Sequence, residues 1–195
     1  GRNKGELHGI PIYTSTNELP RDIDLAVILT PAQTVPPLLD QLGETGIRHA
    51  LIETAGFSEF SEEGALLEQE IYRIAKKWDM KVVGPNCVGI ISMENGINTL
   101  FVRMDKEEMQ LGGATFISQS GGVVLTGTDF LTAGGLGVNK TVSVGNKLIL
   151  KEADYLEYFL RDETTKTILL YLESVVEGRQ LVELTEKGNK PVIVY

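Results

Sequence analysis

The sequence predicts an α/β protein with two parallel-sheet domains, because short apolar runs alternate with stretches of helical periodicity throughout its 195 residues. The continuous apolar run at 25–29 is typical of a strand covered on both faces. The stretch 103–110 is largely polar, and the alternation restarts beyond it. We therefore expect one domain over residues 1–106 and a second over residues 112–195, joined near Met104–Gly113.

Each expected element of the first domain has a local signal. Ser15 and Glu18 have the spacing of a capping box, which predicts a short helix. Gly46 ends a second helix, and Ser61 begins a third. The apolar residues at helical spacing in these two helices are Val35, Leu38, Leu39 and Leu42, then Leu67, Ile71, Ile74 and Trp78. The expected strands are Ile10–Tyr13, Leu25–Leu29, Ala50–Ile52 and Lys81–Val83. Short links between strands and helices favour a parallel sheet with helices on both faces.

The second domain repeats the alternation of strands and helices. The expected strands are Thr115–Ile117, Thr141–Val144, Ile168–Leu172 and Val192–Tyr195. The expected helices are Gly122 to about Ala133, a segment around Leu156, and Gln180–Lys187. Ligand sites of parallel sheets gather at the carboxyl ends of the strands, so the turns after these strands are the candidate sites.

Composition limits the possible functions. Hydrophobic residues make up 42% of the chain, and no run approaches the roughly 20 apolar residues of a membrane helix. A net charge of −9 argues against nucleic acid as a partner, and we expect no membrane partner either. One cysteine and no visible secretory leader indicate the reducing cytoplasm. Metal binding has no support, since Asp22 and Asp24 lack a loop pattern and the histidines are far apart.

The stretch Phe116–Gly122 indicates an anion site at a helix start. It has the pattern of a buried strand followed directly by the first turn of a helix. Ser118 and Ser120 can accept hydrogen bonds from the first helical N–H groups, and Gly121 and Gly122 let a ligand approach the backbone. Unpaired N–H donors and the positive end of the helix dipole suit a phosphoryl group, although an ordinary strand-to-helix turn has the same pattern.

Four motifs occur in order across both expected domains: GPNCVG at 84–89, SQSGG at 118–122, SVGNK at 143–147 and LYLE at 170–173. Together they resemble the α part of the nucleoside-diphosphate-forming acyl-CoA synthetases, which include ADP-forming acetate–CoA ligase and succinate–CoA ligase. The resemblance covers essentially the whole chain. It implies a Rossmann-like CoA-binding domain followed by a flavodoxin-like ligase domain.

The resemblance also implies an activity. The family interconverts acyl-CoA, phosphate and ADP with acid, CoA and ATP through an acyl-phosphate and a phosphohistidine. CoA and a small carboxylic acid are then the ligands of this chain. ATP or ADP and Mg²⁺ enter through an ATP-grasp domain or subunit, and an oligomer is expected.

Individual residues take roles from the same resemblance. The residues implied to line CoA are Pro31, Ala32, Glu53, Thr54 and Ala55, with Asn86 and Cys87 facing its thiol end. Plain sheet-edge turns are the alternative for the strand ends, and packing is the alternative for a lone buried Cys87. Ser120, Gly121 and Gly122 are implied to hold the phosphoryl group or the phosphohistidine. Glu173 is implied to orient the catalytic imidazole, because a carboxylate that accepts one ring N–H leaves the other nitrogen free to attack.

Two family features are absent from this sequence. Neither His8 nor His49 lies in a motif that matches the catalytic histidine, and no Gly-rich phosphate turn precedes the first domain. We therefore expect an internal part of a longer enzyme, inactive alone. One alternative is a non-catalytic CoA-sensing module, such as the ligase-like region of fused acetyltransferases. A nicotinamide-dependent oxidoreductase is disfavoured, since the chain has no Gly-x-Gly-x-x-Gly.

Overall fold

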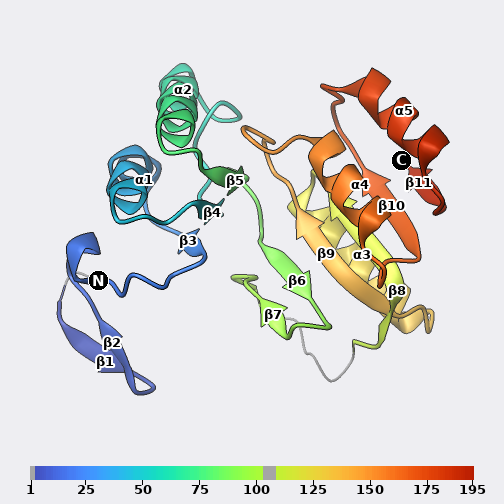
Figure 1. The fold of residues 1–195 in the computed structure, drawn as a ribbon, viewed down its shortest axis with the longest axis horizontal. Helices are drawn as coiled ribbons and strands as arrows, with labels where there is room; N and C mark the ends of the chain where they lie inside the picture. Colours follow the sequence, from blue (N-terminus) through green and yellow to red (C-terminus); the bar gives the residue numbers. More distant parts are fainter. Residues whose placement is uncertain (1–2, 103–108) are drawn as a thin grey trace.

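The computed structural model describes residues 3–102 and 109–195, which fold into two neighbouring α/β domains (Figure 1). The first contains a hairpin of β1 (Gly5–Leu7) and β2 (Ile10–Ile12), the 3₁₀ turns η1 (Thr16–Glu18) and η2 (Ala32–Thr34), strands β3 (Ala26–Ile28), β4 (His49–Ile52) and β5 (Lys81–Val83), and helices α1 (Val35–Glu44) and α2 (Glu62–Lys77). Strands β3, β4 and β5 form a parallel sheet in that order. The expected strands and helices of this domain are confirmed, and β1 is an addition.

Two helix starts in the first domain are capped as their sequence predicts. The Ser61 hydroxyl accepts from the N–H of Gly64 at 3.1 Å, which satisfies one free donor at the start of α2. The Ser15 hydroxyl accepts from the N–H of Asn17 at 3.3 Å, but the helix that follows is the single 3₁₀ turn η1.

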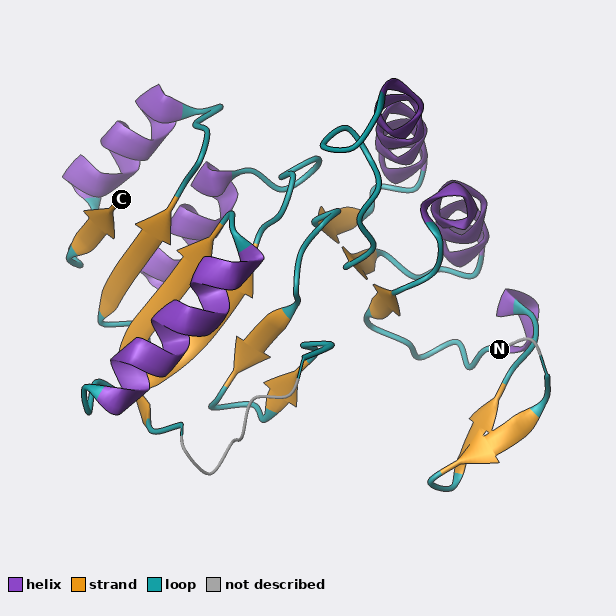
Figure 2. Ribbon diagram, turned by 180° about the vertical axis from the view of Figure 1, so that it is seen from behind, coloured by secondary structure: helices purple, strands orange, loops and turns teal. Residues whose placement is uncertain are grey.

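Both helices of the first sheet lie on one face of it (Figures 1 and 2). The reason is topological, because strands added in sequence order through right-handed crossovers keep their helices on the same side. Ile28 and Ile52 point into the core with these helices, whereas Val27 is 41% exposed and Leu29 57%. The expectation that helices cover both faces of this sheet is therefore wrong for the described residues.

The second domain is built on a six-stranded sheet with the order β11–β10–β8–β9–β6–β7. Its strands are β6 (Ile90–Ser92), β7 (Ile97–Asn98), β8 (Leu111–Ser118), β9 (Val138–Ser143), β10 (Thr167–Tyr171) and β11 (Val192–Val194), and its helices are α3 (Gly121–Ala133), α4 (Glu152–Arg161) and α5 (Gly178–Lys187). Strands β8 to β11 are parallel, whereas β6 and β7 form an antiparallel edge. The predicted parallel sheet is confirmed, and the edge hairpin extends it.

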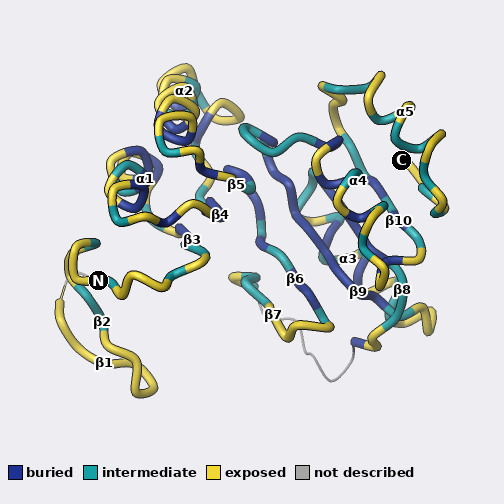
Figure 3. Tube along the Cα trace, in the orientation of Figure 1, coloured by how far each residue is buried: buried dark blue, intermediate teal, exposed yellow. Residues whose placement is uncertain are grey.

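Helices cover both faces of the second sheet, as expected. The chain passes from β8 to its neighbour β9 through α3, then returns through α4 to β10 on the other side of β8. Reversing direction with right-handed crossovers places α3 on one face and α4 with α5 on the other (Figure 2). Every residue of β9 is buried between these layers (Figure 3).

The edge hairpin of β6 and β7 bears on the expected domain limits. Both strands precede residue 106, yet β6 pairs with β9 of the second sheet and β7 pairs with β6 at its edge. The predicted boundary at residue 106 lies outside the described residues, so the limits 1–106 and 112–195 stay a prediction. None of the helices in the described ranges is long and apolar enough to cross a membrane.

Close packing of α3 on β8 gives a test of this fold. A Cβ at Gly127 would overlap Cε1 of Phe116, whereas a Cβ at Gly122 in the same helix would have its nearest neighbour, Ser120 Oγ, at 3.9 Å. We expect Gly127→Ala to lower the free energy of unfolding by about 1–3 kcal/mol. Chemical denaturation measures the change, with Gly122→Ala as the control that should not destabilise. Equal stability of the two variants would contradict the packing of α3 on β8.

Candidate functional site

The carboxyl ends of β8 and β10 form the switch point of the second sheet. The two strands are neighbours, with Tyr171 opposite Ser118. The chain leaves β8 toward α3 on one face of the sheet and leaves β10 toward α5 on the other (Figure 2). Diverging connections open a crevice in which ligands of α/β proteins bind. Ser120–Gly122 begin the first connection and Glu173 the second, so the structure brings these predicted site residues together.

The start of α3 leaves two backbone donors free. Ser120 is the N-cap residue, and its hydroxyl accepts from the N–H of Val123 at 3.4 Å. The N–H groups of Gly121 and Gly122 donate to no group in the described part of the chain. The expected capping by Ser118 is wrong, because its buried hydroxyl donates to the Ser120 carbonyl at 2.7 Å. The helix start thus offers two N–H groups and a helix dipole to an anion.

Gln119 ties the Glu173 backbone to this helix start. Its Oε1 accepts from the N–H groups of Glu173 and Ser174, each at 3.1 Å, and its Nε2 donates to the Ser174 hydroxyl at 3.2 Å. The Glu173 side chain itself is exposed. The sequence places Gln119 in the motif at 118–122 but indicates no role for it, because its partners lie more than fifty residues further along the chain.

Glycines bring the turns of the two sheets into contact. A Cβ at Gly145, whose φ is +54°, would overlap the carbonyl oxygen of Pro85. A Cβ at Gly121 would lie 2.5 Å from Cγ1 of Val88. The Ser143 hydroxyl accepts from the N–H of Val88 at 3.2 Å. The turn at 84–89 therefore packs directly against the turns at 118–122 and 143–147 of the second sheet.

Asn146 fastens the second sheet to the first domain. Its Nδ2 donates to Glu59 and Glu68, each at 2.6 Å. Its Oδ1 accepts from Asn86 at 3.2 Å, which places the predicted CoA residue Asn86 within this junction. Both domains thus contribute to one connected set of turns.

The other predicted CoA residues also lie side by side at strand ends. The Thr54 hydroxyl donates to the Thr30 carbonyl at 2.8 Å, and the Thr54 carbonyl accepts from the N–H of Asn86 at 2.9 Å. Pro31 is the N-cap residue of η2, Ala32 at the first position of η2 is buried, and Ala55 is exposed. The carboxyl ends of β3, β4 and β5 therefore join in one surface, with Ala55 open to a ligand.

Glu53 differs from these neighbours because it is a buried carboxyl without a partner. It is 5% exposed, and neither of its oxygens has a hydrogen-bond partner in the described part of the chain. A Cβ at Gly89 would lie 2.8 Å from Glu53 Oε1 and 2.9 Å from Thr99 Oγ1, so the chain around β6 and β7 covers it. Burial raises the pKa of Glu53 to about 7.

Cys87 is a packing residue in this arrangement. It is 3% exposed, and its thiol donates to the Ile52 carbonyl at 3.3 Å. Burial raises the pKa of Cys87 to about 12, so the reactive thiolate is disfavoured. The histidines are also remote from the helix start. His8 lies in the β1–β2 turn, and His49 begins β4 with Nδ1 3.1 Å from the Asp24 carbonyl oxygen.

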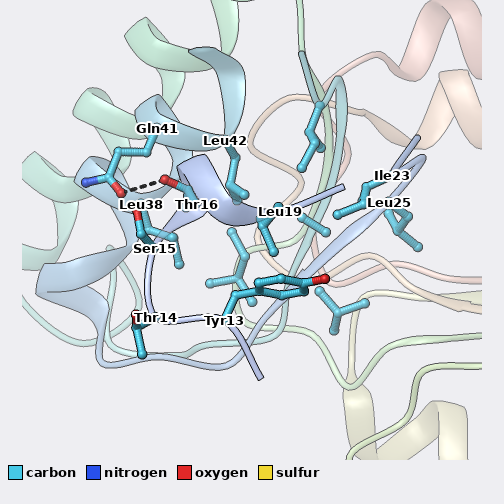
Figure 4. A pocket seen from close by; sticks show the side chains of 14 residues that line it. Tyr13, Thr14, Ser15, Thr16, Leu19, Ile23, Leu25, Leu38, Gln41 and Leu42 are labelled. Atoms are coloured by element: carbon cyan, nitrogen blue, oxygen red, sulfur yellow. Dashed lines mark hydrogen bonds between the residues drawn. The ribbon is translucent and has the colours of Figure 1, made fainter. Parts of the chain in front are cut away.

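A cavity of about 370 Å³ lies elsewhere, beside the edge strand β3 (Figure 4). Apolar side chains from the segment before β3 and from α1, including Leu19, Leu38 and Leu42, line it. The Thr16 hydroxyl donates to Gln41 at 3.1 Å at its rim. None of the predicted site residues lines this cavity, so it is separate from the carboxyl-end site.

The fold and the site define a two-domain α/β protein whose strand-end turns meet at one junction. Two protein-family models match the chain, one over each domain. The family model "CoA binding domain" matches residues 1–93, and the model "Succinyl-CoA ligase like flavodoxin domain" matches residues 111–195. The chain thus belongs to the nucleoside-diphosphate-forming acyl-CoA synthetase family and corresponds to its α-type part.

Relatives cover nearly the whole chain. It is 39% identical over 97% of its length to "Acetate--CoA ligase [ADP-forming] I" of Archaeoglobus fulgidus, and 38% identical over 97% to "Acetate--CoA ligase [ADP-forming] I subunit alpha" of Pyrococcus furiosus. It spans 27% and 41% of those proteins. Among solved structures, the apo form of "dinucleotide forming Acetyl-coenzyme A synthetase 1" of Ca. Korarchaeum cryptofilum superposes with a TM-score of 0.92 at 32% identity, covering 100% of this chain and 42% of that one.

The buried Glu53 carboxyl predicts an unusual pH dependence. Folding raises its pKa from 4.5 to about 7, so its contribution to stability is full below about pH 4.5 and is lost as the pH rises through 7. Glu53→Gln removes this loss and should gain stability relative to the wild type, on the order of 2 kcal/mol, between pH 5 and pH 8. Denaturation at both pH values measures it. Glu70→Gln, at an exposed position of α2, should follow the wild type; identical pH profiles for the wild type and Glu53→Gln would refute the assignment.

Proposed function

We propose that this chain is the CoA- and phosphoryl-binding part of an ADP-forming acyl-CoA ligase. The reaction converts acyl-CoA, phosphate and ADP to acid, CoA and ATP. The observation that carries the proposal is the junction itself. The helix start with the free N–H groups of Gly121 and Gly122 contacts the turn at 84–89, and Gln119 ties the Glu173 backbone to that helix start. Relatives named as ADP-forming ligases support the same activity.

The phosphoryl group binds at the start of α3 in this proposal. Ser120 caps the helix, and the N–H groups of Gly121 and Gly122 donate to the phosphoryl oxygens. In the direction that forms ATP, phosphate displaces CoA from acyl-CoA to give an acyl-phosphate. A histidine from another segment of the parent protein takes the phosphoryl group and releases the acid, and the phosphohistidine then passes the group to ADP. Glu173 accepts the N–H of that imidazole and stabilises its charged form.

CoA binds along the strand ends of the first domain. Pro31, Ala32, Thr54 and Ala55 line its path, Asn86 lies nearest the phosphoryl turn, and Glu53 and Cys87 support the turns from below. The fit rests on the exposed Ala55 and on the contact of the Asn86 turn with the second sheet. Burial raises the pKa of Glu53 to about 7, and this partial protonation lowers the repulsion of the CoA phosphates near this path.

Partners complete the proposed enzyme. An ATP-grasp domain or subunit supplies ATP and Mg²⁺, and the parent is an oligomer of the cytoplasm. The acid is a small carboxylic acid, since the relatives include acetate–CoA ligases and a 4-hydroxybutyrate–CoA ligase of Nitrosopumilus maritimus. The relatives reported are named as ligases rather than sensors, so a non-catalytic CoA-sensing module is not favoured.

The role of Glu173 is tested in the parent protein. Glu173→Gln keeps the size of the side chain but stabilises an imidazolium less, so acid-labile phosphoprotein from labelled ATP should form roughly 10- to 100-fold more slowly. Glu186→Gln, at an exposed position of α5, is the matched control and should not change the rate. Wild-type labelling of Glu173→Gln would remove Glu173 from the mechanism.

The CoA path is tested separately at Ala55. Ala55→Phe fills the exposed turn that follows β4, so CoA should bind at least about tenfold more weakly, a loss of about 1.4 kcal/mol. Phosphorylation by ATP should be unchanged, because the helix start is untouched. Ala133→Phe, at the exposed end of α3, is the control. Calorimetry reports CoA affinity, and unaltered binding by Ala55→Phe would place CoA elsewhere.

A further inference from the structure

Lys147 and Glu152 form an ion pair in the interior of the second domain. Lys147 ends the SVGNK motif, and Glu152 is the first residue of α4. Their side chains are 1% and 0% exposed, with Lys147 Nζ 3.0 Å from Glu152 Oε2. Removing two charges from water costs several kcal/mol per ion, and a buried pair offsets that cost only with further hydrogen bonds. The destination of those bonds indicates what the pair does.

Among the described residues, the hydrogen bonds of these two side chains to other segments reach 174–177, directly after Glu173. Lys147 Nζ donates to the Ser174 carbonyl at 2.5 Å. Glu152 Oε1 accepts from the N–H groups of Val176 and Glu177, the latter at 2.9 Å. Burial would raise the pKa of Glu152, but these N–H groups and the Lys147 ammonium lower it, which keeps the carboxylate ionised.

Little else fixes this segment in place. Residues 173–176 are exposed, with Val175 53% and Val176 62% accessible, so side-chain packing contributes little to their position. Gln119 holds Glu173 and Ser174 from the β8 side. The Lys147–Glu152 pair holds the rest of the segment from the β9 side, so the backbone that carries Glu173 is fixed from both neighbouring turns.

We propose that Lys147 and Glu152 are positioning residues for the ligase reaction, which fix the backbone at 174–177 and thereby aim Glu173 at the phosphoryl turn. This inference rests on the function proposed above. The pair itself does not touch the phosphoryl group. The pair affects the reaction only through Glu173. Replacing the pair and replacing Glu173 should therefore not slow the reaction independently of each other.

The test uses the double variant Lys147→Met/Glu152→Leu in the full-length parent with its nucleotide-binding partner. Apolar residues of similar volume commonly replace a buried ion pair without loss of stability, but they cannot bind the Ser174 carbonyl or the N–H groups at 176 and 177. The freed backbone groups lie in an exposed segment, where water can solvate them. We expect a folded protein whose phosphoprotein forms roughly 10- to 100-fold more slowly, with an unchanged KM for CoA.

Lys140→Met is the matched control. Lys140 is also a buried lysine of an ion pair, 2.7 Å from Glu94 and 2.9 Å from Asp162, but it lies toward the other end of β9. The Lys140→Met variant should form phosphoprotein at the wild-type rate. A loss as large as that of the double variant would mean that any buried ion pair in this domain has the same effect, and would overturn the inference.

Two further measurements make the inference falsifiable whatever the double variant does. In the wild-type parent, the amides of Val176 and Glu177 should exchange slowly with solvent deuterium despite their exposed segment; fast exchange at both would overturn the inference even if the variant does not fold. The triple variant Lys147→Met/Glu152→Leu/Glu173→Gln should form phosphoprotein no more slowly than the single variant Glu173→Gln. If the two slowing factors instead multiplied in the triple variant, the pair would act independently of Glu173 and the inference would be overturned. If Glu173→Gln alone had the wild-type rate, the proposed function would be refuted.

Discussion

The arrangement of the site depends on a backbone contact that leaves no room for a side chain. Gly145 lies against the Pro85 carbonyl, and hydrogen bonds from Asn146 to Pro85 (2.9 Å) and from Leu148 to Gly84 (3.1 Å) continue the contact along the end of β5. The first and second sheets therefore meet through main chain, whose spacing varies far less than that of side chains. In the proposed function, that spacing would set the distance between the CoA path and the phosphoryl turn.

The net charge of −9 restricts how the chain could bind the anions proposed as its ligands, because the protein as a whole repels them. The attraction must come from local donors, namely the free N–H groups at Gly121 and Gly122. In the proposed function, the Glu173 carboxylate would repel a bare phosphate but attract a cationic imidazolium between itself and the phosphoryl group. Its effect would then depend on where the carboxylate points. Gln119 and the Lys147–Glu152 pair hydrogen-bond the backbone at 173–177, which fixes the position of Glu173 in this proposal.

Sequence patterns predicted the long, periodic elements and the meeting of Ser120–Gly122 with Glu173, since both follow buried strands of one sheet. They missed β1, β6 and β7, which are antiparallel strands outside the strand–helix alternation that revealed the equally short β3 and β5. They also missed the exposed face of β3, which follows from strand order rather than from apolar content. The partners of Lys147 lie up to 27 residues away, and only the folded chain brings them together. The roles of the site residues stay predictions.

Whether a buried ionisable side chain keeps its charge depends on its hydrogen-bond and ion-pair partners, which the sequence alone does not show. Lys140 has Glu94 and Asp162 as partners, and Glu152 has Lys147 and two backbone N–H groups, so each of these groups keeps its charge in the interior. Glu53 has no such partner among the described residues and therefore favours its protonated form. Burial thus leaves Glu152 ionised but favours the protonated form of Glu53. At neutral pH a paired carboxylate fixes a neighbouring segment, whereas an unpaired one makes stability depend on pH, and hydrogen-bond partners rather than depth decide which applies.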